Sequence, residues 1–404
     1  MTSTAVVVTG TGMITPAGAG VDETWKAVRD GRTLTGLTSR HADLTERHYL
    51  SVPAFGTDVL PGRGTAHLDP FIRYALVAVD QAIAESGLDP ETWDGSRVGV
   101  VVGCGLGGAT TMSAAQTRLD TRGADTVSPY LHPRSLINMA AGTVAIRHRV
   151  TGPSHTVAAA CASGAVAIGV ARDLLRAGTC DVVIACGTDA GVVPVVAAGF
   201  SAMGALSNSS AADASRPFAA DRSGFVLSEG AAAVVMEREE NARRRGAPDL
   251  GKILGYAYTT DAHHPVQPHP DGAGAEAAVR MALSDAGLVP RNVDHVNAHG
   301  TSTPHNDRIE GRLIRKLFPH DPSVTANKAV LGHSLGAAGA IEAVLTLRTL
   351  TTGVVPPTAH TPAVDPELDG LNLVLGGERC EQPVVAVSNS LGFGGANCVL
   401  VTGV

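Results

Sequence analysis

Cys161 is the residue whose position most directly suggests chemistry. Residues 157–160 form the pattern of a short buried strand, and beyond Cys161 the apolar residues Val166, Val170 and Leu174 recur at the spacing of one helix face. A thiol on such a strand-to-helix turn faces unpaired backbone N–H groups and the positive end of the helix dipole, which favour the thiolate. Cysteines in such places can have a pKa lowered from about 8.5 to roughly 3.5–7.5. The sequence therefore predicts a reactive cysteine, and the alternative is a buried core cysteine.

Two histidines and a lysine lie at loop positions in the second part of the chain. A Val-rich strand over residues 293–298 ends in His299, and Lys328 stands five residues before His333, on a Gly-rich turn that leads into a helix. Phe393 lies in another Gly-rich turn before the last strand. A lone histidine is more often a structural residue. Two histidines at equivalent loop positions, opposite a cysteine on a strand-to-helix turn, favour a functional site instead.

The elements that must position these residues occur twice. Three pairs of segments match in the same order: residues 75–108 with 274–303, the Cys161 turn and its helix with 333–350, and the segment beginning at Gly224 with the one beginning at Gly392. This pattern suggests an internal duplication, although chance similarity of Ala-rich segments is the alternative.

The duplication predicts two halves of the chain with a seam near residue 250. Residues 1–250 carry Cys161, and residues 251–404 carry the two histidines and the last Gly-rich turn. Alternating strands and helices in each half predict an α/β fold with two mixed sheets and with helices between and around them. Ligands gather at strand ends in such sheets, so Cys161 and its counterparts from the other half are expected to meet there.

Composition excludes several classes of protein. The chain has 404 residues, a net charge of -7 and only 3% aromatic residues, which argues against a nucleic-acid binder. Its six cysteines include no C-x-x-C pair and fit neither a zinc cluster nor a disulfide framework, so we expect free thiols in a reducing compartment. No signal sequence and no apolar window of about 20 residues is recognisable, which predicts a cytoplasmic protein.

Four separated segments resemble the β-ketoacyl synthases of the Cys-His-His type, in the thiolase-like superfamily. They are ACASG around Cys161, NAHGTSTPHND from Asn297, NKAVLGHSLGAAGAIE from Asn327 and NSLGFGGAN from Asn389. The resemblance implies a duplicated thiolase-like fold with five layers, αβαβα, and two mixed sheets. It also implies decarboxylative Claisen condensation, in which an acyl chain moves from a carrier protein to the cysteine and a malonyl thioester loses CO2 and attacks it.

The resemblance assigns a role to each residue singled out above. Cys161 resembles the nucleophile, and His299 and His333 match the pair that assists decarboxylation and stabilises the enolate. Two neutral histidines can do this by donating ring N–H groups to the thioester oxygen. Lys328 looks like the lysine that orders the site. The backbone N–H groups of Cys161 and Phe393 resemble the oxyanion pair, with the Phe393 ring as a gate.

Further positions match the family less directly. Glu310 is similar to the buried structural carboxylate near the lysine, and Thr301 and Thr303 correspond to the threonines that bind the phosphopantetheine arm. Leu106 is similar in position to a residue of the acyl tunnel, with ordinary core packing as the alternative. Two residues depart from the family pattern: Leu391, where many relatives have a second Phe in the gating loop, and His305, which replaces a usually smaller residue.

The family implies partners but leaves the pathway open. No metal or bound cofactor is expected, and the substrates are carried on the phosphopantetheine of acyl carrier protein. The CASGAVAIG run and the few basic residues from 42 to 66 favour a type II polyketide ketosynthase, and a housekeeping fatty-acid elongation synthase is the alternative. We expect a dimer through residues 154–160, and the polyketide role implies a heterodimer with a chain-length factor.

The sequence fits three other functions less well. Gly103, Gly105 and Gly108 satisfy the G-x-G-x-x-G dinucleotide motif, but a polar helix follows and no strand ending in an acidic residue appears about 20 residues later. A thiolase needs a second cysteine in the terminal Gly-rich turn, where Phe393 stands. A non-catalytic chain-length subunit would lack the cysteine, which is present here.

Overall fold

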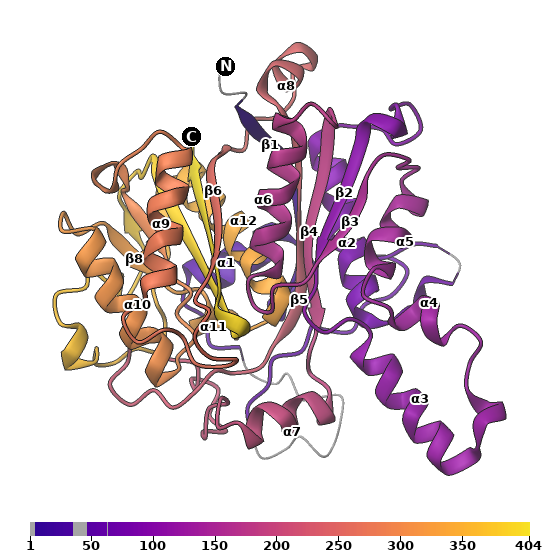
Figure 1. Ribbon diagram of the computed structural model, residues 1–404, viewed down its shortest axis with the longest axis horizontal. Coiled ribbons are helices and arrows are strands. Elements are labelled where there is room, and N and C mark those ends of the chain that lie inside the picture. Colours follow the sequence, from indigo (N-terminus) through magenta and orange to yellow (C-terminus); the bar gives the residue numbers. More distant parts are fainter. Residues whose placement is uncertain (1–4, 35–46, 63) are drawn as a thin grey trace.

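Within the described residues of the computed structural model, 5–34, 47–62 and 64–404, ten strands form one mixed sheet and two more form a small separate sheet (Figure 1). Residues 42–46 and 63 of the stretch poor in basic residues lie outside the described residues. In spatial order the large sheet contains β3 (Ser154–Val157), β2 (Val98–Gly103), β4 (Val182–Ala190), β5 (Glu229–Arg238), β1 (Val6–Ile14), β6 (Lys252–Thr260), β12 (Ala396–Gly403), β11 (Val385–Gly392), β7 (His295–Asn297) and β8 (Ser323–Thr325). The small sheet pairs β9 (Val354–Val355) with β10 (Arg379–Cys380).

The two halves of the large sheet repeat one topology. In the orders β3-β2-β4-β5-β1 and β8-β7-β11-β12-β6, the first three strands are parallel and the remaining pairs are antiparallel. The halves meet at one register pair, Val7 opposite Lys252, and Val8 N–H donates to Gly251 O at 2.8 Å. The α/β fold is confirmed, and the two expected sheets are continuous halves of one sheet. The division of the chain at residue 250 stays a prediction.

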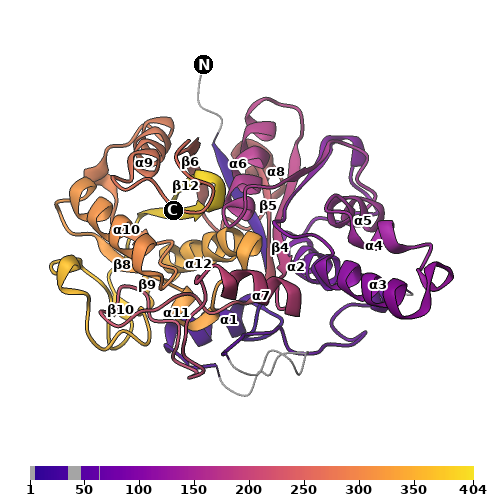
Figure 2. The same ribbon diagram turned by 60° about the horizontal axis from the view of Figure 1, so that its bottom comes forward.

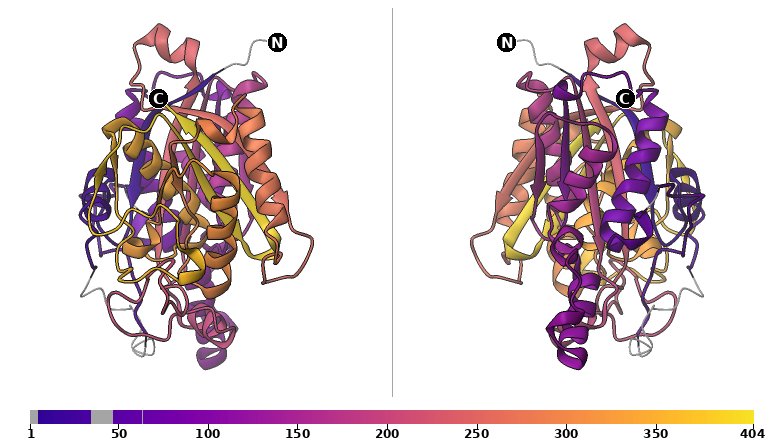
Figure 3. Two further views of the ribbon diagram at one scale, coloured as in Figure 1. Left: turned by 90° about the vertical axis from the view of Figure 1, so that its left-hand side faces the viewer. Right: turned by 90° about the vertical axis from the view of Figure 1, so that its right-hand side faces the viewer.

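Helices cover both faces of each half and produce the expected five layers, which follow one another across Figures 1 and 2. Figure 3 shows the molecule from the side of the second half (left) and from the side of the first half (right). The outer layer on the first half contains α2 (Pro70–Ser86) and α5 (Met139–Arg147). The outer layer on the second half contains α9 (Ala273–Asp285) and α10 (Pro304–Leu317). The central layer, between the halves, contains α6 (Ser163–Arg176) and α12 (Ala338–Thr352).

Small residues allow these layers to pack closely. A Cβ added at Gly12 of β1 would lie 1.9 Å from the carbonyl oxygen of Ala78 in α2, so only glycine lets the helix approach this strand. A Cβ added at Gly164 of α6 would lie 2.8 Å from Ala340 N of α12. The few aromatic residues therefore reflect a core in which helices and strands make close backbone contact.

The remaining helices lie at the ends and rims of the layers. They are α1 (Val21–Arg29), α3 (Ala109–Arg122), α4 (Leu131–Ser135), α7 (Pro194–Ala202), α8 (Glu239–Arg245) and α11 (Lys328–Leu331). Short 3₁₀ helices are η2 (Thr65–His67), η3 (Gly95–Arg97), η4 (Ala124–Thr126), η5 (Pro290–Asn292), η6 (Leu335–Ala337), η7 (Pro366–Leu368) and η8 (Phe393–Gly395). In Figure 1, α3 projects from the body of the molecule at the lower right. Among the described residues no helix has the length and apolar character needed to cross a bilayer.

Candidate active site

Cys161 lies on the expected turn between β3 and α6. Ala160, directly before it, has a left-handed backbone with φ of 47°, a conformation that costs free energy for a residue with a Cβ. The turn is held by Ser163, whose Oγ accepts from Ala159 N–H at 2.9 Å and donates to Ala160 O at 2.7 Å. This strained turn directs the Cys161 side chain into a cavity.

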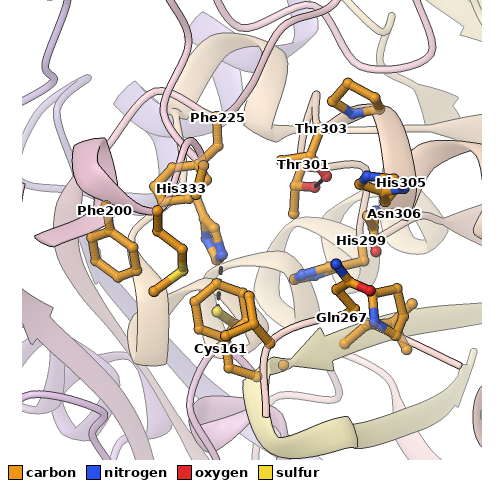
Figure 4. A pocket seen from close by; sticks show the side chains of 18 of the residues that line it. Cys161, Phe200, Phe225, Gln267, His299, Thr301, Thr303, His305, Asn306 and His333 are labelled. Carbon is orange, nitrogen blue, oxygen red and sulfur yellow. Dashed lines mark hydrogen bonds between the residues drawn. The ribbon is translucent and has the colours of Figure 1, made fainter. Parts of the chain in front are cut away.

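Both predicted histidines reach the same cavity from the second half of the chain (Figure 4). His333 Nε2 lies 3.1 Å from Cys161 Sγ, within hydrogen-bonding distance. The His299 and His333 rings are nearly perpendicular, with centroids 5.4 Å apart. Cys161 is 8% exposed and each histidine 2%. The structure therefore brings together the sulfur and the two imidazoles that the sequence separates by more than a hundred residues.

Lys328 assigns the tautomer of His299. The Lys328 ammonium at the start of α11 donates to His299 O at 2.7 Å and lies 3.3 Å from His299 Nδ1. An ammonium can only donate, so Nδ1 must accept. In neutral His299 the proton is then assigned to Nε2, by the hydrogen-bond network, and is available to a bound ligand.

Burial keeps both histidines neutral near pH 7. It lowers the pKa of His299 and of His333 well below the ordinary value, and the nearby Lys328 charge lowers both further. Neutral imidazoles can donate a ring N–H without placing a buried positive charge beside the substrate.

The predicted lowering of the Cys161 pKa is wrong for this structure. Burial raises the pKa of the Cys161 thiol to about 12, although Lys328 and the backbone N–H groups of Phe393 and Cys161 act in the opposite direction. Because the Cys161 side chain is buried, the cost of desolvating a thiolate exceeds the effect of the helix end. Cys161 therefore rests as a thiol hydrogen-bonded to His333.

The predicted pair of backbone donors lies beside the sulfur. The N–H groups of Phe393 and Cys161 both face Sγ. Gly392 at the end of β11 permits this approach, because a Cβ there would lie 2.9 Å from Ala159 O and 3.1 Å from Cys161 N. The Phe393 ring lines the cavity, 6.2 Å from the Phe200 ring centroid.

Glu342 is the carboxylate that pairs with Lys328, and the sequence reasoning missed it. Both side chains are fully enclosed, and they form an ion pair between α11 and α12. Burial raises the pKa of Glu342 to about 7 against the pull of Lys328. The signal was present, since Glu342 is the lone charged residue in the otherwise small and apolar run from 334 to 347.

Glu310, expected near the lysine, is buried but acts on the His299 loop. It accepts from His299 N–H at 2.7 Å, Gly300 N–H at 2.9 Å and Asn389 Nδ2 at 3.1 Å. Its carboxylate thus fixes the backbone that carries His299 rather than forming the ion pair with Lys328.

The cavity, of about 290 Å³, has two chemically different walls. Its apolar residues include Phe200, Met203, Phe225, Leu335, Leu391 and Phe393, and its polar residues include Gln267, Thr301, Thr303, His305 and Asn306. The hydroxyl oxygens of Thr301 and Thr303 lie 2.9 Å apart. Leu106 is 36% exposed and does not line this cavity.

No group of three or more metal-binding side chains in suitable positions is found within the described part of the chain.

The chain belongs to the β-ketoacyl synthase family. Residues 3–242 match the family described as "Beta-ketoacyl synthase, N-terminal domain", and residues 250–362 match "Beta-ketoacyl synthase, C-terminal domain". The family comprises acyl-transferring enzymes that form carbon–carbon bonds, so the predicted enzyme class is confirmed. The dinucleotide-binding and thiolase alternatives are set aside.

Relatives with similar sequences over almost their whole length are 3-oxoacyl-[acyl-carrier-protein] synthases. The chain is 39% identical to 3-oxoacyl-[acyl-carrier-protein] synthase 2 of Rhizobium meliloti (strain 1021), over 98% of each protein. It is 38% identical to the mitochondrial 3-oxoacyl-[acyl-carrier-protein] synthase of Arabidopsis thaliana, over 98% of this chain and 92% of the relative.

Solved structures with the same fold include polyketide enzymes. The ishigamide ketosynthase/chain length factor superimposes with a TM-score of 0.92 at 30% identity, covering 99% of each chain. The type II ketosynthase AntDE, in complex with its acyl-carrier protein AntF, gives a TM-score of 0.91 at 28% identity, again over 99% of each chain. The relatives named 3-oxoacyl-[acyl-carrier-protein] synthase 2 favour the elongation-synthase alternative over our main prediction of a polyketide enzyme.

Proposed function

We propose that this chain is a 3-oxoacyl-[acyl-carrier-protein] synthase that extends a carrier-bound acyl chain by two carbons. The observation that carries the proposal is the contact between Cys161 Sγ and His333 Nε2 at 3.1 Å, with His299 beside them in its Nε2–H tautomer. This set contains a nucleophile, a proton acceptor and a donor for an enolate in one cavity.

The first step is transfer of the acyl group to Cys161. The sulfur attacks the carbonyl carbon of the acyl-carrier thioester, and the N–H groups of Cys161 and Phe393 stabilise the tetrahedral oxyanion. His333 Nε2 receives the thiol proton and returns it to the carrier thiol that leaves. A thiol with a pKa of about 12 needs such an acceptor at the moment of attack.

The second step uses the same histidines as donors. Malonyl carrier loses CO2, and the enolate oxygen is stabilised by His299 Nε2–H and His333 Nε2–H. His333 Nδ1 is buried and has no hydrogen-bond partner within the described residues, so nothing fixes its tautomer. Nε2 of His333 is therefore free to accept a proton in the first step and to donate one in the second.

Carbon–carbon bond formation completes the cycle. The enolate carbon attacks the acyl carbonyl, and the Cys161 sulfur leaves as a thiolate and takes up a proton from solvent, the one proton that the overall reaction consumes. The product is a 3-oxoacyl carrier thioester with two more carbons, and one CO2 is released. In this proposal Thr301 and Thr303, which line the cavity, bind the phosphopantetheine arm, and the apolar wall accepts the acyl chain.

We infer that acyl carrier protein is the partner that delivers both substrates. The names of the relatives contain this carrier, and AntDE is a ketosynthase in complex with one. We favour fatty-acid-type elongation because relatives with that name are 36–40% identical over almost the whole chain. A type II polyketide role is the second candidate, supported by the ishigamide and AntDE structures.

The exposed edge strand β3 supports a dimer. Ser154 and His155 are exposed at the end of the ten-stranded sheet, where a second strand can add backbone hydrogen bonds. A homodimer suits the elongation role, and a heterodimer with a chain-length factor suits the polyketide role, as in the ketosynthase ApeO in complex with ApeC.

The test is reconstitution from purified components. The chain alone is incubated with saturated acyl carriers of several lengths and with malonyl carrier, and products are identified by mass spectrometry. We expect one CO2 for each 3-oxoacyl product. If product forms only after a chain-length factor is added, the polyketide role is favoured. If CO2 is released but no condensation product forms at any chain length, the proposal is contradicted.

A further inference from the structure

Asp189 is a buried carboxylate that the mechanism above does not use. It lies near the end of β4 and has no exposed surface. Four donors converge on its two oxygens: Gly105 N–H at 2.9 Å, Leu106 N–H at 2.9 Å, Gly336 N–H at 2.7 Å and Cys104 Sγ at 3.2 Å. Three of these donors come from the loop after β2, and Gly336 comes from η6 in the other half of the chain.

The surroundings of Asp189 suit an anion. Gly107 N–H donates to Cys104 Sγ at 3.2 Å, which leaves the S–H proton of Cys104 to donate to Asp189. Every partner found for the carboxylate among the described residues is thus a donor, and none is a basic side chain. A carboxylate with several N–H donors can remain ionised even when it is buried, although burial raises the pKa of Asp189.

Two glycines make room for this carboxylate. A Cβ added at Gly105 would lie 2.9 Å from Asp189 Oδ2, and one added at Gly336 would lie 2.6 Å from it. A Cβ at Gly103 would lie 2.1 Å from Ser163 O at the start of α6. The G-x-G-x-x-G pattern after β2, which resembles a dinucleotide motif, is therefore explained in part by close contacts with Asp189 and α6.

The contact with Gly336 reaches the turn that carries His333. His333 N–H donates to Val226 O at 2.7 Å, and Ser228 N–H donates to His333 O at 3.0 Å, which fixes one side of this turn. On the other side, Leu335 has a left-handed backbone with φ of 52°, and Gly336 N–H is held by Asp189. Without the hydrogen bond from Gly336 N–H to Asp189, the strained backbone of Leu335 can relax and shift His333.

We propose that Asp189 is a positioning residue that locks the His333 turn to the loop after β2 and so holds His333 Nε2 against Cys161. The inference rests on the proposed function of His333. The negative charge of the same carboxylate also acts on Cys161 and raises the pKa of its thiol. Asp189 thus couples the two halves of the fold at the point where their reactive groups meet.

The test compares Asp189→Asn with Cys104→Ala. The asparagine NH2 group lies either against Leu106 N–H and Cys104 Sγ or against Gly105 N–H and Gly336 N–H, so the variant removes the negative charge in both orientations and the Gly336 contact in the second. Cys104→Ala removes one donor and keeps both the charge and the Gly336 contact. We expect Asp189→Asn to lower kcat of condensation about 10–10²-fold, the range that a misplacement of about 1 Å produces, with KM for the acyl carrier within threefold. Cys104→Ala should stay within threefold of wild type in both constants.

Crystal structures of wild type and Asp189→Asn provide a readout that does not depend on condensation. We expect the distance between His333 Nε2 and Cys161 Sγ to exceed hydrogen-bonding range in the variant. If the wild-type enzyme condenses nothing, the proposed function fails, yet this distance still tests the positioning role. An unchanged distance with kcat within twofold of wild type, or an equal loss of kcat in Cys104→Ala, would overturn the inference.

A backbone variant covers the case in which Asp189→Asn does not fold. Replacing Gly336 by glycolic acid turns its peptide bond into an ester, which deletes only the N–H of residue 336, one of three backbone N–H donors to Asp189, and adds no side-chain atom. The matched control places leucic acid at Leu106, which deletes an N–H donor from the first half. We expect the ester at 336 to lower kcat at least tenfold and the ester at 106 to lower it less than threefold; equal effects would contradict the proposal.

Discussion

Replacing Lys328 by methionine separates the structural role of this lysine from its role at His299. Methionine keeps most of the side-chain volume but removes the ammonium that pairs with Glu342 and donates to His299. Both members of the ion pair are 2% exposed, so the variant leaves a buried carboxylate without its counter-charge. Breaking a buried ion pair from one side costs about 3–5 kcal/mol of unfolding free energy.

The loss of stability should depend on pH. The pKa of Glu342 is already raised from an ordinary value of 4.5 to about 7, so the folded state binds more protons than the unfolded chain between these values, and stability falls as pH rises through them. Without the ammonium the pKa rises further, and the window extends to higher pH. Lys328→Met should therefore be less stable at pH 8 than at pH 6, because at pH 6 Glu342 is protonated.

Decarboxylation should fall for a different reason. Without Lys328, nothing fixes the Nε2–H tautomer of His299, so a fraction of the molecules lacks this N–H donor to the enolate. We expect CO2 release from malonyl carrier to fall about 10²-fold, the lower end of the effect of losing one oxyanion donor. The double variant Lys328→Met/Glu342→Gln should regain most of the stability and none of the decarboxylation.

The assay combines chemical unfolding at the two pH values with measurement of CO2 release. A matched control is Lys316→Met, which breaks an exposed ion pair with Glu276 and should cost less than about 1 kcal/mol, with CO2 release unchanged. Wild-type CO2 release in Lys328→Met, or recovery of both properties in the double variant, would refute the reasoning.

Three further predictions follow from the site geometry. Gly392→Ala should slow acyl transfer about 10²–10³-fold, because its Cβ displaces the Phe393 N–H from Cys161. The control Gly377→Ala, whose Cβ meets no atom within 4 Å, should leave the rate unchanged. The rate of acyl transfer is measured as release of carrier thiol. The double variant Thr301→Val/Thr303→Val should raise KM for acyl carrier with little change in kcat, and a short N-acetylcysteamine thioester should be unaffected. Three buried histidines, His295, His299 and His333, should lower stability as pH drops below 6.5, because their folded-state pKa is lowered. This contribution opposes that of Glu342, so it should be larger in the pH profile of the melting temperature of Glu342→Gln than in that of wild type.

The sequence was sufficient for the reactive residues and the α/β architecture. Three sequence patterns predicted them: the small residues around Cys161, the Gly-rich turns and the repeated order of segments. Each pattern reports on backbone geometry, so the structure agrees with it. The convergence of Cys161, His299 and His333 followed from the duplication, which places equivalent loops at one end of the two half-sheets.

Properties that depend on burial could not be read in this way. The helix end beside Cys161 suggested a thiolate. The cost of desolvating that thiolate depends on how deeply Cys161 is buried, and residues from both halves of the chain bury it. The pairing of Lys328 with Glu342 depends on how α11 meets α12. The position of Leu106 outside the cavity likewise depends on the packing of the loop after β2 rather than on its sequence.

Mapping the acylated residue tests the central claim most directly. The protein is incubated with acyl carrier alone, and the adduct is located by peptide mass spectrometry in wild type and in Cys161→Ala. We predict one acyl group per chain on Cys161 in wild type and none in the variant. An adduct of equal yield in Cys161→Ala, or one located on any other residue of the wild-type protein, would contradict the account.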